Sequence, residues 1–124
     1  MMENSNPDGL PKIKGYNIIN GQLKLASDGS TFLSINPAVL ADELGEFPLS
    51  TRDDVHDAIA AARVALTGWA ATPAPTRGQI IGNMGRLLME YKDDLVRLQA
   101  REFGKTLKEC GGEIQEAIDT CLFF

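Results

Sequence analysis

The spacing of apolar residues changes once along the chain, at about Ser50. Before that point, short apolar or alternating stretches are separated by turn sequences, and Asn20-Gly21 is a strong tight-turn pair. After it, apolar residues recur at every third or fourth position, which is the spacing of amphipathic helices. The pattern therefore predicts a short antiparallel β meander over residues 16–49, followed by helices over residues 50–124.

Three helices are expected in this second part. The first begins near Ser50, where hydroxyl and acidic side chains suit a helix N-terminus, and it ends in the proline-rich stretch 72–75. One stripe of this helix is apolar and consists of Val55, Ile59, Ala62, Leu66 and Trp69. The second helix is expected from about residue 77, with a kink or a fresh cap at 92–94, as far as the C-cap residue Gly104.

The third helix covers residues 106–124 and contains the pair Gly111-Gly112. Each glycine weakens a helix by about 1 kcal/mol relative to alanine. If the helix persists there, tight packing against a neighbour is the expected reason. The helix runs into the apolar sequence 121–124 without a glycine cap, so we expect the polypeptide to continue beyond it.

The first residues, 1–15, are polar and are expected to form a flexible arm. They lack the apolar core of a signal peptide, and no later apolar run is long enough to span a bilayer, so the cytoplasm is the expected compartment. Hydrophobic residues make up 44% and charged residues 23% of the chain, as in ordinary globular proteins. A net charge of -5 argues against nucleic acid as a partner.

Few residues suggest chemistry. His56 lies on a polar helix face and has no catalytic companion, and Cys110 and Cys121 have no metal-ligand spacing, so both thiols are expected to be reduced and packed. The glycines form neither a dinucleotide fingerprint nor a phosphate-binding loop. An acidic series runs along the third helix and most simply indicates a solvent-exposed helix face; its members are Glu109, Glu113, Glu116 and Asp119. No catalytic, cofactor-binding or metal-binding residue is therefore expected.

Several stretches in a fixed order resemble the N-terminal segment of the aldehyde dehydrogenase superfamily. They are Ile19-Asn20-Gly21-Gln22, Asn36-Pro37-Ala38, the helix from Asp54 to Trp69, Glu102-Phe103-Gly104-Lys105, and Gly112 to Glu116 with Asp119 and Cys121. The last of them is most similar to the α-aminoadipic semialdehyde dehydrogenase, or antiquitin, branch. One departure, at 39–46, is the absence of the usual Thr-Gly-Glu turn, which leaves the local strand register open.

The resemblance implies an α/β fold, of which residues 50–124 are the helical part of an incomplete cofactor-side domain. It also implies NAD or NADP as cofactor, a homo-oligomer at full length, and the remainder of the dehydrogenase chain as partner. The nucleophilic cysteine and cofactor loops of the family lie beyond this segment, so the chain alone is expected to be inactive and to bind no cofactor. In the antiquitin branch a glutamate at the position of Glu113 is expected near the amino-acid end of the substrate, where it would suit an ammonium group.

Two alternatives to an enzyme segment remain at this point. In one, the chain is a non-enzymatic helical module that binds a partner. In the other, it is half of a split enzyme that needs a second chain. As a dehydrogenase segment on its own, the chain leaves apolar stripes such as Ile80, Met84 and Leu87 without cover, so we expect poor solubility or self-association. A non-enzymatic module would instead bind its partner through those stripes.

Overall fold

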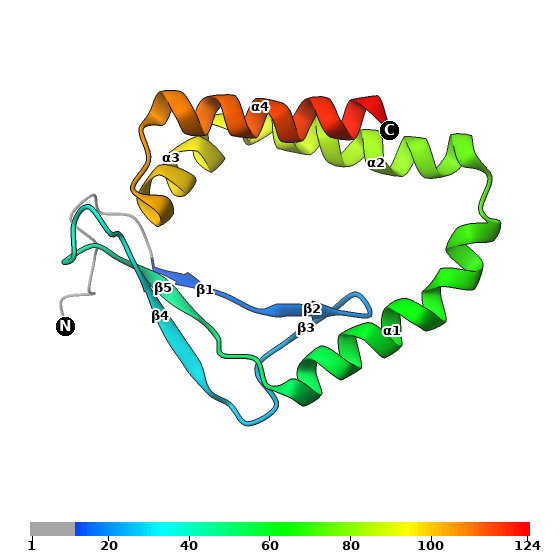
Figure 1. The fold of residues 1–124 in the computed structure, drawn as a ribbon, viewed down its shortest axis with the longest axis horizontal. Coiled ribbons are helices and arrows are strands. Elements are labelled where there is room, and N and C mark those ends of the chain that lie inside the picture. Colours follow the sequence, from blue (N-terminus) through cyan, green and yellow to red (C-terminus); the bar gives the residue numbers. More distant parts are fainter. Residues whose placement is uncertain (1–11) are drawn as a thin grey trace. The chain divides into compact units, whose positions relative to one another are not determined.

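The computed structural model describes residues 12–124, and the chain divides into two compact units, residues 1–67 and 68–124. The first unit contains five strands, β1 (Ile13–Lys14), β2 (Asn17–Ile19), β3 (Gln22–Lys24), β4 (Thr31–Ile35) and β5 (Glu43–Pro48), and most of α1 (Arg52–Ala71). The second contains α2 (Ala74–Glu90), α3 (Lys92–Phe103) and α4 (Leu107–Phe123) (Figure 1). Each unit is described by itself.

Strands β2 and β3 form an antiparallel hairpin of their own. Its turn is the predicted Asn20-Gly21 pair, and both residues have positive φ, 52° and 73°. This is the geometry of a type I′ turn, whose twist matches that of the two strands it connects. The dipeptide signal in the sequence is therefore confirmed.

The other three strands form a separate sheet in the order β1-β5-β4. The single antiparallel meander predicted for residues 16–49 is thus divided between two sheets, because β3 does not pair with β4. Strand β1 lies outside the predicted range and pairs with β5 in parallel, with Ile13 opposite Gly45. Gly45 permits this pairing, since a Cβ at this position would lie 1.9 Å from the carbonyl oxygen of Ile13. The arm predicted for residues 1–15 thus ends in a strand, and its residues 1–11 lie outside the described part of the chain.

Strand β4 pairs with β5 in antiparallel fashion, and their connection is a loop of seven residues, 36–42. The register shifts between Ser34 and Ile35, close to the Asn36-Pro37 break. The loop closes on itself through hydrogen bonds from the backbone N–H of Asn36 to the carbonyl of Asp42 (2.9 Å) and from the Asn36 side chain to the Asp42 carboxylate (3.0 Å). The stretch 39–46, which lacks the Thr-Gly-Glu turn, begins in this loop and continues into β5.

The second unit has three helices, so the chain has four in its described part rather than the predicted three. The helix expected as one element from residue 77 to Gly104 is divided at Tyr91, whose ψ of 14° interrupts the helical path. Asp93 and Asp94 then lie in the first turn of α3, where acidic side chains favour a new helix start. The structure thus starts a new helix at this point rather than kinking one helix, although Tyr91 makes no side-chain capping hydrogen bond.

Helices α2 and α4 are packed through small residues. Gly85 of α2 is buried, and a Cβ there would lie 3.0 Å from the Cβ of Cys121 in α4. The buried residues of α4 are Cys110, Ile118 and Cys121, so the expectation that both free thiols pack as small apolar groups is confirmed. The close packing expected of Gly111-Gly112 is not found, because no atom of the structure lies within 4 Å of a Cβ built on either residue.

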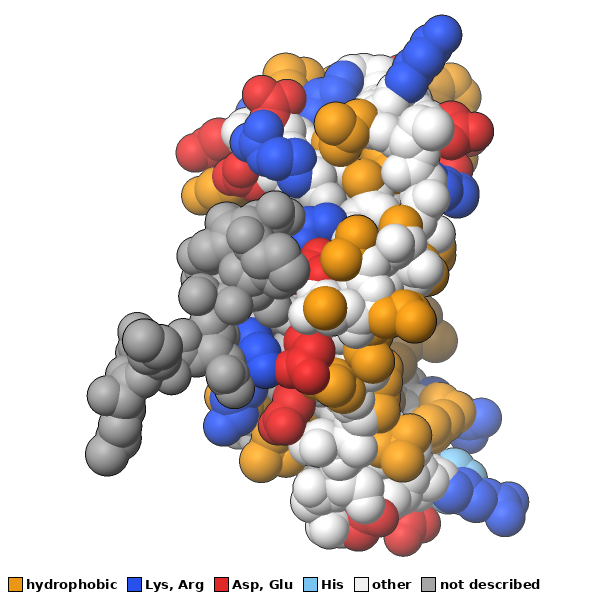
Figure 2. All heavy atoms as spheres, turned by 90° about the vertical axis from the view of Figure 1, so that its left-hand side faces the viewer, with side chains coloured by type: hydrophobic (Ala, Val, Ile, Leu, Met, Phe, Trp, Pro, Cys, Tyr) orange, Lys and Arg blue, Asp and Glu red, His pale blue; other side chains and the backbone are white. Residues whose placement is uncertain are grey.

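Many large apolar side chains remain at the surface. Among them are Ile59 of α1, Leu87 of α2 and Phe123 of α4, which are 48%, 55% and 82% exposed. Figure 2 shows apolar side chains between charged ones over much of the face in view. Among residues 12–124, no helix is both long and apolar enough to cross a membrane.

Candidate functional site

The first candidate site is the junction of α3 and α4 together with Glu113 of α4, the one residue that the sequence proposed for substrate contact. Helix α3 ends at Gly104, whose φ of 69° is left-handed as predicted for a C-cap. Helix α4 begins with a capping box, in which Thr106 Oγ1 accepts from the backbone N–H of Glu109 and the Glu109 carboxylate accepts from that of Thr106. The Thr106 hydroxyl also donates to the Glu109 carboxylate at 2.8 Å, and this hydrogen bond, together with the one from the Thr106 backbone N–H, holds the pKa of Glu109 below its ordinary value. Lys105 lies between the two helix ends.

Glu113 lies two turns into α4 and is already engaged. Its carboxylate accepts a hydrogen bond from Lys105 Nζ at 2.5 Å and another from Gln99 Nε2 of α3. The Glu113 side chain is 42% exposed and that of Lys105 is 43% exposed, so the pair is at the surface but not fully solvated. The hydrogen bond to Glu113 raises the pKa of Lys105. Glu113 therefore presents a paired carboxylate rather than a free one.

Polar contacts also extend along α4 beyond this pair. Lys92 Nζ of α3 donates to Gln115 Oε1 at 2.6 Å, and Gln115 Nε2 donates to the Asp119 carboxylate at 2.8 Å. The acidic series therefore has several separate roles, of which capping by Glu109 and pairing by Glu113 are two. The sequence analysis missed Gln99 and Lys105 as partners of Glu113, because hydrogen bonds between residues on different elements leave no periodic signal.

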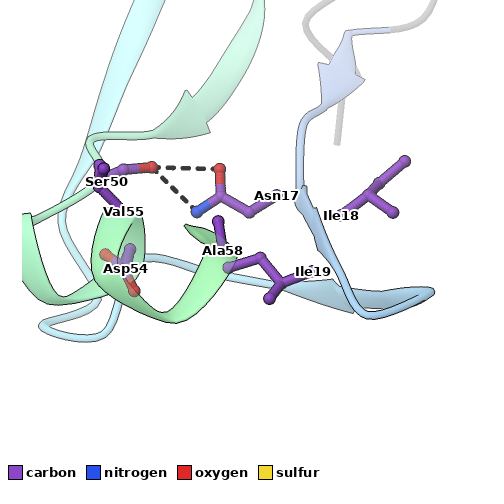
Figure 3. A pocket seen from close by; sticks show the side chains of 7 residues that line it. All are labelled: Asn17, Ile18, Ile19, Ser50, Asp54, Val55 and Ala58. Atoms are coloured by element: carbon purple, nitrogen blue, oxygen red, sulfur yellow. Dashed lines mark hydrogen bonds between the residues drawn. The ribbon is translucent and has the colours of Figure 1, made fainter. Parts of the chain in front are cut away.

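A second candidate is an open depression of about 170 Å³ between β2 and the start of α1. Figure 3 shows the side chains that line it, which are Asn17, Ile18, Ile19, Ser50, Asp54, Val55 and Ala58. Asn17 and Ser50 exchange two hydrogen bonds, of 2.9 and 3.1 Å, and the other lining residues are mainly apolar (Figure 3). The Ser50 hydroxyl is bonded to Asn17, and the Asp54 carboxylate is bonded to Thr51 and Ser27. The one hydroxyl of the lining is therefore not paired with a base that could activate it.

Asp54 is the buried carboxylate at that depression, and its bonds are structural. It accepts from the backbone N–H of Thr51 at 2.7 Å and from that of Ser27 at 3.1 Å. These hydrogen bonds hold the pKa of Asp54 below the ordinary value. The helix start predicted near Ser50 is thus a capping box between Thr51 and Asp54, and Asp54 also ties the 26–30 turn to α1.

The remaining candidates give no site. His56 is exposed on α1, and no group of three or more potential metal ligands occurs within the part of the chain that the structure describes. The glycines of α2 and α4 lie inside helices, so residues 12–124 contain no glycine-rich loop between a strand and a helix to hold a pyrophosphate.

Comparison with known proteins gives a consistent family. The model of the aldehyde dehydrogenase family matches residues 25–124. A malonate-semialdehyde dehydrogenase of Geobacillus thermodenitrificans is 38% identical over 116 residues, which are 94% of this chain and 23% of that protein. The NADP+-dependent succinate-semialdehyde dehydrogenase GabD of Escherichia coli is 42% identical over 100 residues, 81% of this chain and 20% of that protein.

A solved structure gives the same fold. The NAD-dependent aldehyde dehydrogenase from Sinorhizobium meliloti superposes with a TM-score of 0.86 at 25% identity, covering 98% of this chain and 24% of that one. The chain thus spans about a quarter of the length of the proteins it matches. The two relatives are named for malonate and succinate semialdehydes, which carry no amino group, so they do not support the antiquitin branch. The α/β fold of an N-terminal dehydrogenase segment is confirmed, and the chain belongs to the aldehyde dehydrogenase family.

Proposed function

We propose that this chain is the N-terminal part of an NAD(P)-dependent aldehyde dehydrogenase that oxidises a semialdehyde carrying a carboxylate at its other end. The match of residues 25–124 to the family carries the reaction class. The substrate class rests on the two relatives, because malonate semialdehyde and succinate semialdehyde share that terminal carboxylate. α-Aminoadipic semialdehyde carries one as well, together with an amino group, and is the narrower candidate from the sequence.

The cofactor is NAD or NADP, since one structural neighbour is named as NAD-dependent and one relative as NADP+-dependent. We assign its binding to the remainder of the dehydrogenase chain, because the connection from β5 to α1 contains no glycine-rich loop. We place the nucleophile and the base there too. The family resemblance supports a homo-oligomer at full length and a cytoplasmic enzyme as further parts of this proposal.

Glu113 distinguishes the two substrate candidates. A free carboxylate on α4 would attract an ammonium group and repel a carboxylate. Lys105 Nζ already donates to this carboxylate and competes with a substrate ammonium group for it, which favours a substrate without an amino group.

The proposal is tested by determining the sequence that follows the codon for Phe124 and expressing the extended polypeptide. Formation of reduced nicotinamide is then followed with malonate, succinate and α-aminoadipic semialdehydes, each with NAD and with NADP. We expect oxidation of at least one of these semialdehydes by the extended polypeptide and none by residues 1–124 alone. An extended polypeptide that oxidises none of them refutes the proposed function, and activity that appears only after a second chain is added supports the split-enzyme alternative.

The role of Glu113 is tested in the same enzyme with Glu113→Gln, with Glu116→Gln as control on an exposed position of α4. A contact with an amino group predicts a raised KM for α-aminoadipic semialdehyde and an unchanged KM for succinate semialdehyde. A purely structural role predicts the same change for both substrates. Glu116→Gln should change neither.

A further inference from the structure

The β2–β3 hairpin is closed by Asn20 and Gly21 and forms a sheet of its own (Figure 1). Next to the turn, Ile19 lies opposite Gln22. The element with which β3 makes extensive contact is β2, and no other part of residues 12–67 buries any residue of β3. A two-stranded hairpin without a covering layer is only marginally stable in water, so it opens locally more often than the whole chain unfolds.

The turn sequence carries a reaction of its own. The side-chain amide of an asparagine is attacked by the backbone nitrogen of the next residue, and the attack is fastest at glycine, which has no side chain to hinder it. Here the Gly21 nitrogen bonds to Asn20 Cγ and closes a five-membered succinimide. The C–N bond of the Asn20 amide breaks, and its nitrogen leaves as ammonia with the proton of the Gly21 N–H. Water then opens the ring at either carbonyl and gives aspartate or isoaspartate.

The closed turn keeps the reacting groups apart. Asn20 and Gly21 have φ of 52° and 73°, as in a type I′ turn. In that turn ψ of the first central residue is about 30°, which places the Gly21 nitrogen nearly opposite the Asn20 Cβ about the Cα–C bond. Ring closure requires both on the same side of that bond, a conformation incompatible with the pairing of Ile19 and Gln22. The reaction is therefore blocked while the hairpin is closed.

We propose that Asn20-Gly21 is a spontaneous modification site, at which Asn20 is converted to aspartate or isoaspartate when the β2–β3 hairpin opens. Because a short hairpin opens and closes much faster than the ring forms, the rate of conversion follows the population of the open hairpin. The two products affect the hairpin differently. Asp-Gly suits the same turn, so the aspartate form closes again. Isoaspartate adds a methylene group to the backbone of the turn, which disturbs the strand register and keeps the hairpin open.

The test follows each asparagine of the 124-residue chain during incubation at neutral pH, by peptide mapping with mass spectrometry. An isoaspartyl methyltransferase labels the isoaspartate product. Asn36 and Asn83 are internal controls. Asn36 precedes Pro37, which has no backbone N–H, and Asn83 lies inside α2, where helical hydrogen bonds hold the next amide. We expect conversion at Asn20 and none at either control.

The dependence on hairpin opening is tested with the double variant Ile18→Cys and Leu23→Cys. These two positions are directly opposite in the register, at a separation that a disulfide between strands can span. The oxidised form holds the hairpin closed, and reduction of the same protein releases it. We expect conversion of Asn20 to be several-fold slower in the oxidised form than in the reduced form. Leu23→Gly removes a cross-strand pair and should accelerate the conversion.

Equal rates in the oxidised and reduced forms overturn the inference. A synthetic peptide of residues 16–25 gives the rate without a hairpin. Conversion of the whole chain as fast as the peptide overturns the inference, because the hairpin then gives no protection. An Asn20 that stays intact while the peptide converts completely also overturns it, because the hairpin then does not open. If the double variant does not fold, Leu23→Gly decides, and a rate no higher than that of the parent chain contradicts the dependence on opening.

Discussion

The two units of the chain are stabilised in different ways. In residues 68–124, α2 and α4 meet through Gly85 and Cys121, and Ile118 is completely buried. In residues 12–67, the helix is connected to the strands mainly through a polar cluster around Asp54. The same helical apolar spacing thus has two outcomes, since α4 buries three side chains within its own unit and α1 buries only Asp54. Apolar periodicity predicts a helix face that is suited to packing, but not which element packs against it.

Ile118→Ala is expected to have the largest effect on this contrast. Ile118 is 0% exposed, and replacement of a fully buried isoleucine by alanine costs about 2–5 kcal/mol because it removes apolar contacts and leaves a cavity. The matched control is Ile80→Ala in α2, whose side chain is 49% exposed. Urea unfolding of both variants at low protein concentration, followed by circular dichroism, measures the difference. Equal losses of unfolding free energy would show that the second unit has no core of its own.

The glycines give the next largest effect. Gly85→Ala puts a Cβ 3.0 Å from the Cβ of Cys121, whereas Gly112→Ala meets no atom within 4 Å. Both gain about 1 kcal/mol of helix propensity, and only Gly85→Ala pays an overpacking cost of about 1–3 kcal/mol. Gly85→Ala should therefore unfold at a lower urea concentration than Gly112→Ala. The reverse order would contradict the close contact between α2 and α4.

Other contacts of the chain's glycines show which features can be predicted from the sequence and which cannot. The turn at Asn20-Gly21 and the cap at Gly104 follow from local backbone requirements, and both were predictable. The contact of Gly85 with Cys121 and the pairing of β1 with β5 depend on residues far apart in the chain. A single sequence carries no direct signal for such pairs.

The candidate site at Glu113 also has features that the sequence predicts and features that it does not. The sequence singled out Glu113 through a family resemblance, and the position of Glu113 on α4 follows from helical periodicity. Its partners Lys105 and Gln99 come from a turn and from another helix, so these hydrogen bonds could only be found in three dimensions. The substrate preference was the least predictable part, because the sequence offered only Glu113 as a contact, and the unsubstituted semialdehydes enter through the names of the relatives.

The third prediction compares the two capping boxes directly. Thr51→Ala and Thr106→Ala each remove a hydroxyl that accepts a backbone N–H at a helix start, a change that costs about 1 kcal/mol. In α4 the loss should lower the stability of the whole packed unit. In α1 it should instead accelerate hydrogen exchange at the Asp54 and Val55 amides with little effect on the second unit. Mass-spectrometric hydrogen exchange separates the two responses, and a uniform change in both variants would mean that the two units unfold together.

The smallest expected effect is a change with pH at the start of α1. Hydrogen bonds from Thr51 and Ser27 lower the pKa of Asp54. The ionised carboxylate therefore stabilises the folded state at pH values above about 3.9, the ordinary pKa of aspartate. The stabilisation is lost as pH falls through the lower pKa of the folded state, because protonation weakens the acceptor. The Thr51 and Ser27 amide signals in NMR should titrate together with a midpoint below that value. Asp54→Asn keeps an acceptor oxygen and removes the charge, so its two amide signals should show no such step. A titration midpoint at or above the ordinary aspartate pKa in the parent chain would mean that the polar cluster does not hold α1 to the strands. The proposed difference between the two units would then be wrong for residues 12–67.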